Sequence, residues 1–548
     1  MTGWTTLADL DDEARNARFD RLQERMASVW ETVGRNLDDE SVVVVPSVPP
    51  SRMGTGSGTL AQAYEERFLF LLLLLRQPRL RMVYVTSLPV DPRIIEYYLA
   101  LLPGVIPSHA RSRLSMVSVG DASPRALTQK LLERPRLLAK IAAMVPDRSR
   151  CHLIPYGTTS LERDLALTLD IPMYGADPRL AALGTKTGCR RLFGEVGVPY
   201  PLGAEDLHGV DEVVDAIDGL LARRPAMREV IVKLNDGVSG SGNALVDLDG
   251  ISALRGSERR PAIAERVRAM RLESPTTAFE TYAELLESDG GIVEERIVGT
   301  DLLSPSVQLR ALPDGTVELL STHDQLLGGA SGQSYLGCVF PADPAYSRLI
   351  GEPAMAIGER LAAEGVLGRF AVDFVVVRDA AGDWTAHAIE VNLRKGGTTH
   401  PFLTLQFLTD GRYDAESGRF VTPDGAEKHL VATDHLEAAE LRALSVGDLF
   451  DVVARHGLHF DQSRQSGIVF HMISSITEHG RVGMTAVGDS AEHAMELYER
   501  SRNVLLDEAR VAGRAATIPG PAAASAPPSA SPSPSPTPSR VGSLTPGR

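Results

Sequence analysis

Two short apolar runs in the second half of the chain carry polar side chains where a buried β-strand would turn them inward. Residues 371–378 read Ala-Val-Asp-Phe-Val-Val-Val-Arg and hold one carboxylate, Asp373. Residues 388–392 read Ala-Ile-Glu-Val-Asn, so Glu390 and Asn392 share one face of a strand. An unpaired carboxylate is costly inside an apolar strand. Three oxygen donors on adjacent strands suit Mg²⁺, which takes one or two carboxylates and keeps positions for water and phosphate oxygens.

These strands have a second interpretation, in which they lie at a sheet edge and turn their acids to solvent. The two strands alone do not decide between the interpretations, because most carboxylates in proteins are exposed. The choice depends on what the rest of the chain places beside them.

The size and composition of the chain indicate a multi-domain globular protein. At 548 residues it exceeds what one core supports, so two to four domains are expected. Its net charge of −15 argues against nucleic acid as a partner. Three scattered cysteines, Cys151, Cys189 and Cys338, form no disulfide or zinc pattern, which is typical of a cytoplasmic protein. We expect no signal peptide and no membrane partner, since the apolar run at 68–75 is too short to span a bilayer.

Changes in local pattern divide the chain into four segments, and the fold class expected is α/β combined with α+β. Residues 1–180 alternate strand-like and helical runs, which predicts an α/β domain with a parallel sheet. Residues 181–425 mix hairpin-like strands with helices. Residues 426–512 read as a smaller α+β domain, with helices at 436–444, 446–456 and 491–509 and strands at 467–474 and 483–487. The Pro/Ser/Ala-rich tail, 513–548, is predicted to be disordered.

Two lysines and a glycine-rich loop precede the acidic strands. Lys186 opens a predicted helix, and Lys233 ends the strand-like run 229–233. The loop 235–243, Asn-Asp-Gly-Val-Ser-Gly-Ser-Gly-Asn, leads to a returning strand. Its small residues let backbone N–H groups close over phosphates, and a strand-end lysine supplies a point charge. A plain hairpin turn needs only two to five residues, so the length of this loop favours phosphate binding.

A further segment, residues 291–301, predicts a strand that leads into a turn. Its exposed backbone could hydrogen-bond an adenine edge, with Asp301 placed for ribose hydroxyls. The alternative for its Glu-Glu-Arg sequence is a solvated face.

In this order, the helix lysine, the strand-end lysine with its glycine loop, the acidic hinge and the Asp…Glu-x-Asn strands resemble the ATP-grasp superfamily over residues 181–405. Local details at 390–401, 304–310 and 64–67, together with the C-terminal segment, are similar to the pheganomycin-type peptide ligase family. The resemblance implies that 1–180 is a pre-ATP-grasp domain, 181–425 the two-lobed ATP-grasp catalytic domain and 426–512 the C-terminal domain of that family.

The resemblance also implies roles for particular side chains, carried over one position at a time. They are Lys186 and Lys233 for the ATP phosphates; Ser239, Gly240, Ser241 and Gly242, on to Asn243, for the mobile flap; Glu294, Glu295 and Ile297 for the adenine hinge; Asp301 for the ribose; and Asp373, Glu390 and Asn392 for the metal.

One position departs from the superfamily pattern. Many ATP-grasp ligases have an arginine two residues before the first metal acid, and here that residue is Ala371. The candidates for the anion-stabilising catalytic role are therefore Arg310, Arg369, Arg394 and Lys395.

The implied reaction begins when a substrate carboxylate attacks the γ-phosphate of ATP with Mg²⁺, or Mn²⁺ in its place, to give an acyl phosphate. An amine then displaces phosphate and forms an amide. The substrates expected are small-molecule or peptide acids and amines, and assembly into a homo-oligomer is left open. The alternatives are an ATP-dependent phosphotransferase and a nucleotide-binding regulatory protein with a decayed site.

The residues after the acidic strands supply further donors. Gly396, Gly397, Thr398 and Thr399 could hold the acceptor substrate or an oxyanion. Three histidines invite a catalytic interpretation, but lone histidines beside strands are more often satisfied core or rim residues. These are His400, His471 and His479.

Overall fold

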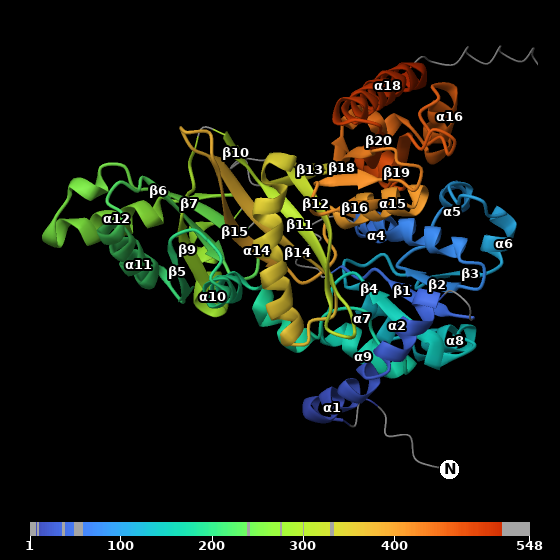
Figure 1. Ribbon diagram of the computed structural model, residues 1–548, viewed down its shortest axis with the longest axis horizontal. Helices are drawn as coiled ribbons and strands as arrows, with labels where there is room; N and C mark the ends of the chain where they lie inside the picture. Colours follow the sequence, from blue (N-terminus) through green and yellow to red (C-terminus); the bar gives the residue numbers. More distant parts are fainter. Residues whose placement is uncertain are drawn as a thin grey trace, which may run out of the picture.

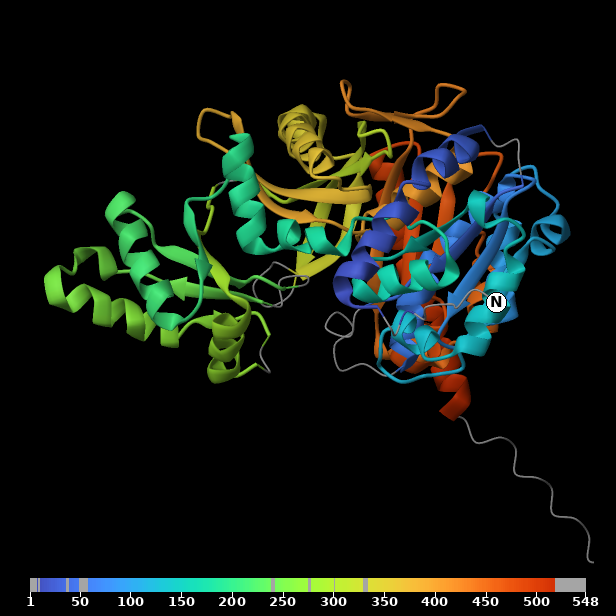
Figure 2. The same cartoon turned by 90° about the horizontal axis from the view of Figure 1, so that it is seen from below.

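The computed structural model describes residues 7, 10–35, 39–48, 58–237, 242–274, 277–299, 301–328 and 334–517. Three sheets carry the fold (Figures 1 and 2). The lobe built around the five-stranded sheet lies at one end of the molecule, and the N-terminal and C-terminal parts lie together at the other. The structure therefore contains both the α/β and the α+β architecture that the sequence predicts.

The N-terminal sheet is parallel throughout, as predicted, in the order β3-β2-β1-β4. Its strands are β1 (Ser41–Val45), β2 (Arg81–Thr86), β3 (Leu114–Ser118) and β4 (Cys151–Pro155). The helices around it are α1 (Asp12–Gln23), α2 (Met26–Arg35), α4 (Gly58–Glu66), α5 (Pro92–Ala100), α6 (Pro107–Arg111), α7 (Leu127–Leu132), α8 (Pro135–Met144) and α9 (Ser160–Leu169). The helical run at 125–145 is divided into α7 and α8, because Pro135 cannot continue a helix but suits the first turn of the next one.

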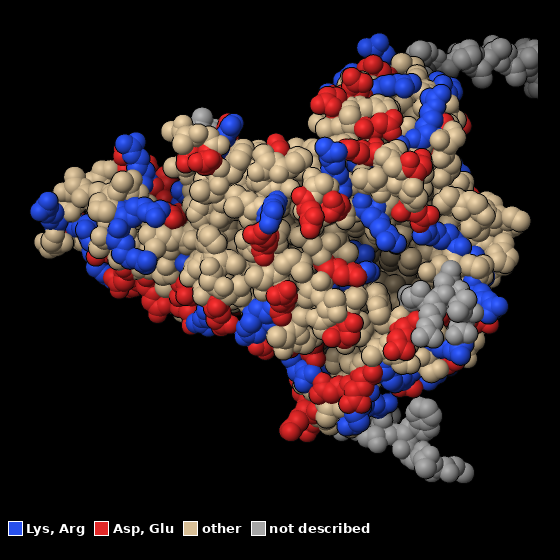
Figure 3. All heavy atoms as spheres, in the orientation of Figure 1, with Lys and Arg blue, Asp and Glu red and all other residues tan. Residues whose placement is uncertain are grey.

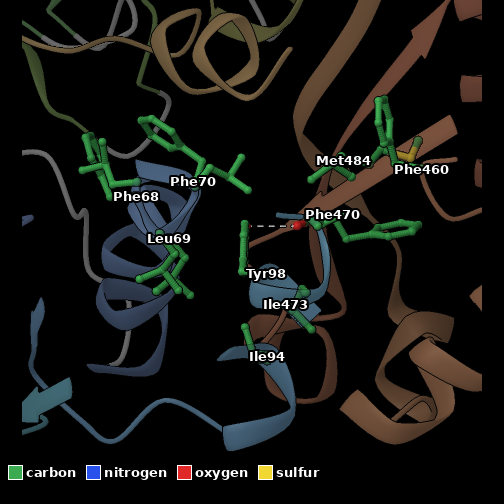
Figure 4. Close-up of a cluster of buried hydrophobic side chains, with 14 of the residues drawn as sticks. Phe68, Leu69, Phe70, Ile94, Tyr98, Phe460, Phe470, Ile473 and Met484 are labelled. Atoms are coloured by element: carbon green, nitrogen blue, oxygen red, sulfur yellow. Dashed lines mark hydrogen bonds between the residues drawn. The ribbon is translucent and has the colours of Figure 1, made fainter. Parts of the chain in front are cut away.

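The most apolar run of the chain forms η2, a 3₁₀-helix at Arg67–Arg76 that is buried along nearly its whole length. Figure 4 shows Phe68, Leu69 and Phe70 of η2 in the same cluster as side chains of α5 and of the C-terminal strands. The Tyr98 hydroxyl donates to the Phe470 carbonyl at 3.1 Å within it. The N-terminal and C-terminal parts therefore share one core.

The five-stranded sheet has the order β5-β9-β6-β7-β8 and is antiparallel. Its strands are β5 (Gly203–Leu207), β6 (Glu229–Leu234), β7 (Asn243–Asp247), β8 (Arg271–Leu272) and β9 (Gly291–Glu295), with helices α11 (Val210–Arg223), α12 (Arg259–Arg268) and α13 (Phe279–Asp289). Alternate residues of β6, β7 and β9 pack with these helices in one core, so the opposite face is left for polar side chains. We call this unit the small lobe.

The nine-stranded sheet runs in the order β10-β14-β11-β12-β13-β18-β20-β19, with β15 paired to β14. Its strands are β10 (Asp301–Leu303), β11 (Pro305–Ala311), β12 (Val317–Gly328), β13 (Ser334–Phe340), β14 (Gly368–Arg378), β15 (Trp384–Asn392), β18 (His429–Glu437), β19 (Gly467–His471) and β20 (Arg481–Gly488). Helix α14 (Pro344–Ala363) packs on β11 and β12, and α10 (Lys186–Val196) joins the small lobe to β15. Because β13 pairs with β18, the strands after residue 426 extend the sheet begun by the preceding segment.

The C-terminal segment differs from its prediction in two places. A helix expected at 436–444 is instead the end of β18 followed by a 3₁₀-helix, Ala439–Ala443. Pairing of Leu436 and Glu437 with β20 outweighs the helix propensity of these two residues. The last helix, α18, runs from Ala491 to Thr517, past the predicted start of the tail, and residues 518–548 lie outside the described part of the chain. Helix α16 (Val446–Arg455) matches its prediction.

The surface and the cysteines complete the description. Acidic and basic side chains are interspersed over the face seen in Figure 3. Cys151, Cys189 and Cys338 are buried free thiols. Within the described ranges no helix has the length and apolarity to cross a bilayer.

Candidate nucleotide and metal site

The two acidic strands form the hairpin that the sequence predicts. β14 and β15 are antiparallel, with Asp373 opposite Glu390 and Ala371 opposite Asn392. The register shifts by one residue next to Asp373, which leaves Ile389 as an extra residue beside Glu390. Bulges of this kind occur near active sites, where they redirect a side chain. The side chains of Asp373 and Asn392 are half-buried, so the solvent-facing edge interpretation does not hold.

Asp373 is held from two sides by amides. Gln325 Nε2 donates to its Oδ1 at 2.9 Å, and Asn392 Nδ2 donates to its Oδ2 at 2.8 Å. Burial, together with the neighbouring Glu390 carboxylate, raises the pKa of Asp373 to about 6. Two carboxylates facing each other in a buried place are stabilised by a cation between them. The donor set, all oxygen and partly preorganised, therefore fits a hard divalent ion such as Mg²⁺.

Lys186 lies directly against this hairpin. It is the first residue of α10, whose N-cap Thr185 accepts a hydrogen bond from Gly188 N. Its Nζ is 2.6 Å from Glu390 Oε2, and the side chain is buried. Burial opposes the charge on Lys186, but the Glu390 carboxylate outweighs it and holds the pKa of the amine above its ordinary value. The predicted phosphate lysine and a predicted metal acid are thus in contact.

The second lysine belongs to the same region. Lys233, near the end of β6, is buried and forms an ion pair with Glu294 of β9. Arg190 of α10 approaches the same carboxylate, with Nη1 3.6 Å from Glu294 Oε2. Asn235, directly after β6, links this strand to α10, because its Oδ1 accepts a hydrogen bond from Thr187 N at 2.9 Å. The structure therefore brings Lys186 and Lys233 to one site between the small lobe and the nine-stranded sheet.

The predicted adenine hinge is more enclosed than expected. β9 lies between β5 and β6, and Glu294 and Glu295 are 3% and 8% exposed, so a solvated face is excluded for these two acids. Glu295 forms an ion pair with Arg224 and accepts from Leu202 N at 2.9 Å. Its own N–H donates to the Leu202 carbonyl at 2.8 Å. The expectation of exposed backbone is therefore wrong at Glu295, and Ile297 lies beyond the end of the strand.

The predicted flap and the predicted ribose acid have different outcomes from the lysines. Ser239, Gly240 and Ser241 lie outside the described residues, whereas the Gly242 carbonyl accepts from Leu234 N and from the Tyr282 hydroxyl, each at 3.0 Å. Asp301 pairs with Arg378 in the sheet. Because side chains alternate along β14, Arg378 and its partner Asp301 lie on the face opposite to Asp373. The geometry does not support a ribose-binding role for Asp301.

A polar stripe on β11 continues the face that carries the metal acids. Ser306, Gln308 and Arg310 pair in register with Asp373, Ala371 and Arg369, and paired antiparallel residues share a face. Gln308 Nε2 donates to Thr398 Oγ1 at 2.7 Å, and Thr399 Oγ1 donates to Gln308 Oε1 at 3.1 Å.

The sequence prediction missed the roles of Gln308 and Gln325, because their partners lie tens of residues away. The alternation of polar residues within 304–310 was the available signal for Gln308.

Two of the candidates for the anion-stabilising role, Arg310 and Arg369, are paired at the far end of this stripe. Arg310 forms an ion pair with Glu318 and stacks over Trp30, 5.4 Å from the ring centre. Within the described residues Arg369 forms no ion pair. Burial, with the nearby Arg310 charge acting in the same direction, lowers the pKa of Arg369 to about 10. Four residues separate it from Asp373 along β14, or about 13 Å of strand.

The other two candidates, Arg394 and Lys395, contact the N-terminal part. Arg394 Nη1 is 3.5 Å from the Tyr156 hydroxyl, and Lys395 Nζ donates to the Pro155 carbonyl at 2.6 Å. Lys395 is 5% exposed, and burial together with the charge of Arg369 lowers its pKa to about 7. The residues after β15 thus form a junction between the metal hairpin and the end of β4.

Family comparisons give the same picture of the architecture. A family described as IQCH-like ATP-grasp matches residues 178–268 and 256–416, and one described as PGM1 C-terminal domain matches residues 448–501. Two biotin carboxylases of known structure are similar in fold: that of Campylobacter jejuni in complex with an ATP analogue (TM-score 0.50, 13% identity, 87% of this chain and 96% of that one) and the Hydrogenobacter thermophilus 2-oxoglutarate carboxylase domain with ADP and magnesium (TM-score 0.51, 12% identity, 86% and 94%).

Two curated proteins are similar in sequence. IQ motif-containing protein H of Danio rerio is 22% identical over 481 residues, which cover 79% of this chain but 45% of that protein. L-propargylglycine–L-glutamate ligase of Streptantibioticus cattleyicolor is 31% identical over 451 residues, or 80% of this chain and 89% of the ligase. With that identity across nearly the whole of the ligase, the chain belongs to the ATP-grasp carboxylate–amine ligases of the pheganomycin type.

Proposed function

We propose that this ligase joins the carboxylate of one amino acid or short peptide to the amine of another, with ATP converted to ADP and phosphate. The observation that carries the proposal is the Lys186–Glu390 contact opposite Asp373, a cation and two acids facing each other at one edge of the polar stripe. The name of the S. cattleyicolor relative, a ligase of two amino acids, supports the choice of substrate class.

In this proposal Lys186 and Lys233 bind phosphate oxygens of ATP. Each lysine now neutralises a carboxylate, Glu390 and Glu294 respectively, so phosphate oxygens would replace or share those partners. Asp373, Glu390 and Asn392 would hold Mg²⁺, which when bound neutralises charge on the transferring phosphoryl group. The chain's own contribution is to position the reacting groups and to stabilise the charge that develops on oxygen.

A cation along the stripe would hold the substrate carboxylate. Arg369 is the strongest candidate, because it is largely enclosed, shares the face of Asp373 and forms no ion pair among the described residues. Arg310 is already paired with Glu318, and Arg394 and Lys395 are turned toward the end of β4. The side chain of Lys395 would then shape the pocket rather than bind the reacting anion.

The acyl phosphate must survive until the amine arrives, so water has to be excluded. We propose that the glycine loop from Ser239 to Gly242 closes over the phosphates for this purpose. The hydroxyls of Thr398 and Thr399 already bond to Gln308, so we assign them the role of supporting the Gln308 amide next to the substrate.

The test incubates purified protein with Mg·ATP and a matrix of amino acids and short peptides, and follows ADP release and product mass. We expect ADP release that depends on both an acid and an amine, together with a condensed product. Acid-dependent ADP release without an amine requirement would indicate a phosphotransferase. A complete lack of turnover across the matrix would favour a regulatory nucleotide-binding protein.

A further inference from the structure

A second cluster of charged and imidazole side chains contains none of the residues assigned to the nucleotide or the Mg²⁺. It consists of His400 in α15 (Thr399–Thr409), Asp434 in β18 and His471 at the end of β19. All three are nearly inaccessible, at 2–3% exposed. Among the described residues, these three form the one group of His, Cys, Asp or Glu side chains whose ligand atoms lie close enough together to hold a metal ion.

The three ligand atoms converge on one another. His471 Nε2 is 2.7 Å and His400 Nε2 is 3.2 Å from the same oxygen, Asp434 Oδ1. The two nitrogens are themselves 3.0 Å apart. Such a triangle differs from two separate hydrogen bonds, in which each imidazole would approach its own acceptor.

Hydrogen atoms alone do not satisfy this triangle. If both nitrogens carry hydrogen, the 3.0 Å contact between His400 and His471 sets two donors against each other. If only one does, the other nitrogen turns a lone pair toward the carboxylate oxygen. A cation bound by all three atoms would turn each of these lone pairs into a ligand bond.

The distances admit such an ion. Placed about 2.1 Å from each atom, it would see the three ligands at angles of about 80° to 100°, a facial arrangement with its remaining positions on one side. Two imidazoles and one carboxylate suit Zn²⁺, Fe²⁺, Co²⁺ or Ni²⁺, whereas Mg²⁺ prefers oxygen ligands. We propose that His400, Asp434 and His471 bind a divalent transition-metal ion.

Neighbouring groups orient these ligands. Arg67 Nη1 bonds to Asp434 Oδ2 at 2.6 Å, which leaves Oδ1 to face the imidazoles. The His471 ring lies on the backbone of Gly483, where a Cβ atom would stand 2.1 Å from Nε2. Because Arg67 already neutralises Asp434, the ion adds positive charge to a buried place, so we expect weaker binding than at a site of several anions.

The ion would tie together segments that are far apart in the chain. Its ligands come from α15, just after the metal hairpin, and from two strands of the C-terminal part, while Arg67 belongs to η2 of the N-terminal part. Helix α15 packs against η2 of the N-terminal part and against β18, in the region of Figure 1 where these parts meet. The proposed role is therefore structural, and it does not depend on the ligase activity.

The test measures metal, not turnover. The full chain is expressed with zinc in the medium, purified without chelators and analysed for zinc per chain by mass spectrometry. A Co²⁺ titration followed by visible absorption reports whether imidazole ligands are present. The variants are His471→Gln and His400→Gln, with His109→Gln as a matched control on the exposed helix α6 and Glu390→Gln to remove binding at the acidic hairpin.

We expect about one zinc per chain in the wild type, in His109→Gln and in Glu390→Gln, and at least a tenfold loss of affinity in His471→Gln and in His400→Gln. A chelator should lower the Tm of the wild type and leave that of His471→Gln unchanged, which separates lost metal from lost folding. Equal zinc content in the wild type and His471→Gln would overturn the proposal. So would a loss confined to Glu390→Gln.

Discussion

The acidic hairpin and the histidine cluster are linked in sequence by the short segment from Asn392 to His400 but are opposite in character. At the hairpin, the half-buried Glu390 contacts Lys186 of α10, and the raised pKa of Asp373 indicates that its charge is incompletely compensated. In the cluster, Asp434 is fully buried, and despite burial the nearby imidazoles and Arg67 hold its pKa well below the usual range. The first arrangement is suited to bind and release charged ligands, whereas the second is suited to remain closed. The comparison teaches that charged side chains left open between two lobes suit ligands that come and go, whereas a closed cluster suits a structural role.

Replacement of the buried acid should have the largest effect. Asp434→Ala leaves Arg67 as an uncompensated buried charge, so we expect it to lower the free energy of unfolding by about 3–5 kcal/mol. Urea denaturation followed by circular dichroism measures this. The double variant Arg67→Met/Asp434→Leu should recover much of the loss, and a single variant as stable as the wild type would show that the pair is not buried in solution.

At the hairpin the effect should fall on activity instead. Glu390→Gln and Lys233→Ala should each lower the rate of ADP production. We expect each to lose about 3–4 kcal/mol of transition-state stabilisation, by comparison with the loss of one oxyanion donor. The Tm of Glu390→Gln should stay near that of the wild type, because the Glu390 side chain is partly exposed. Lys233→Ala should also lower the Tm, because it leaves the buried Glu294 carboxylate with only the more distant Arg190 as a partner. Initial rates at saturating ATP give the measurement. Near-wild-type rates in either variant would contradict the assignment.

A third prediction concerns pH and the helix that precedes Arg67. Burial, although opposed by a hydrogen bond from Ser474 N, raises the pKa of Glu66 from 4.5 to about 7, with Glu65 adding to the rise. The folded protein then binds more protons than the unfolded chain between these values, so stability should fall as pH rises through this window. The change is about 3 kcal/mol at most. Glu66→Gln should flatten the dependence in urea titrations at pH 5 and 8, and an identical slope in both proteins would exclude Glu66 as its source.

The smallest effect should come from the glycine under the histidine ring. Gly483→Ala places a methyl group against His471, so we expect a loss of about 1–3 kcal/mol from overpacking. It should also abolish zinc binding without lowering the rate of ADP release. Gly219→Ala, within helix α11, where an added Cβ meets nothing within 4 Å, serves as the control for zinc binding. Full zinc occupancy in Gly483→Ala would show that the ring can move aside.

Local signals were sufficient for the N-terminal sheet and for the local setting of several site residues, but not for the segment 436–444. The alternation of β-like and helical runs predicted the parallel N-terminal sheet, and the positions of Lys186 and Lys233 at a helix start and near a strand end are confirmed. Period-two spacing put Glu390 and Asn392 on one face. These predictions succeed because each depends on residues adjacent in sequence.

Long-range pairing decided the rest. The sequence alone determined that Asp373, Glu390 and Asn392 are strand-borne oxygen donors preceded by two lysines, and that the family is ATP-grasp. Only the tertiary structure set Asp373 opposite Glu390, enclosed Glu295 between two strands and carried Asp301 to the opposite face. It also brought His400 and His471, treated separately in the sequence as core residues, onto one carboxylate. The physical reason is that register and sheet order depend on contacts between distant segments, which no local pattern of side chains specifies.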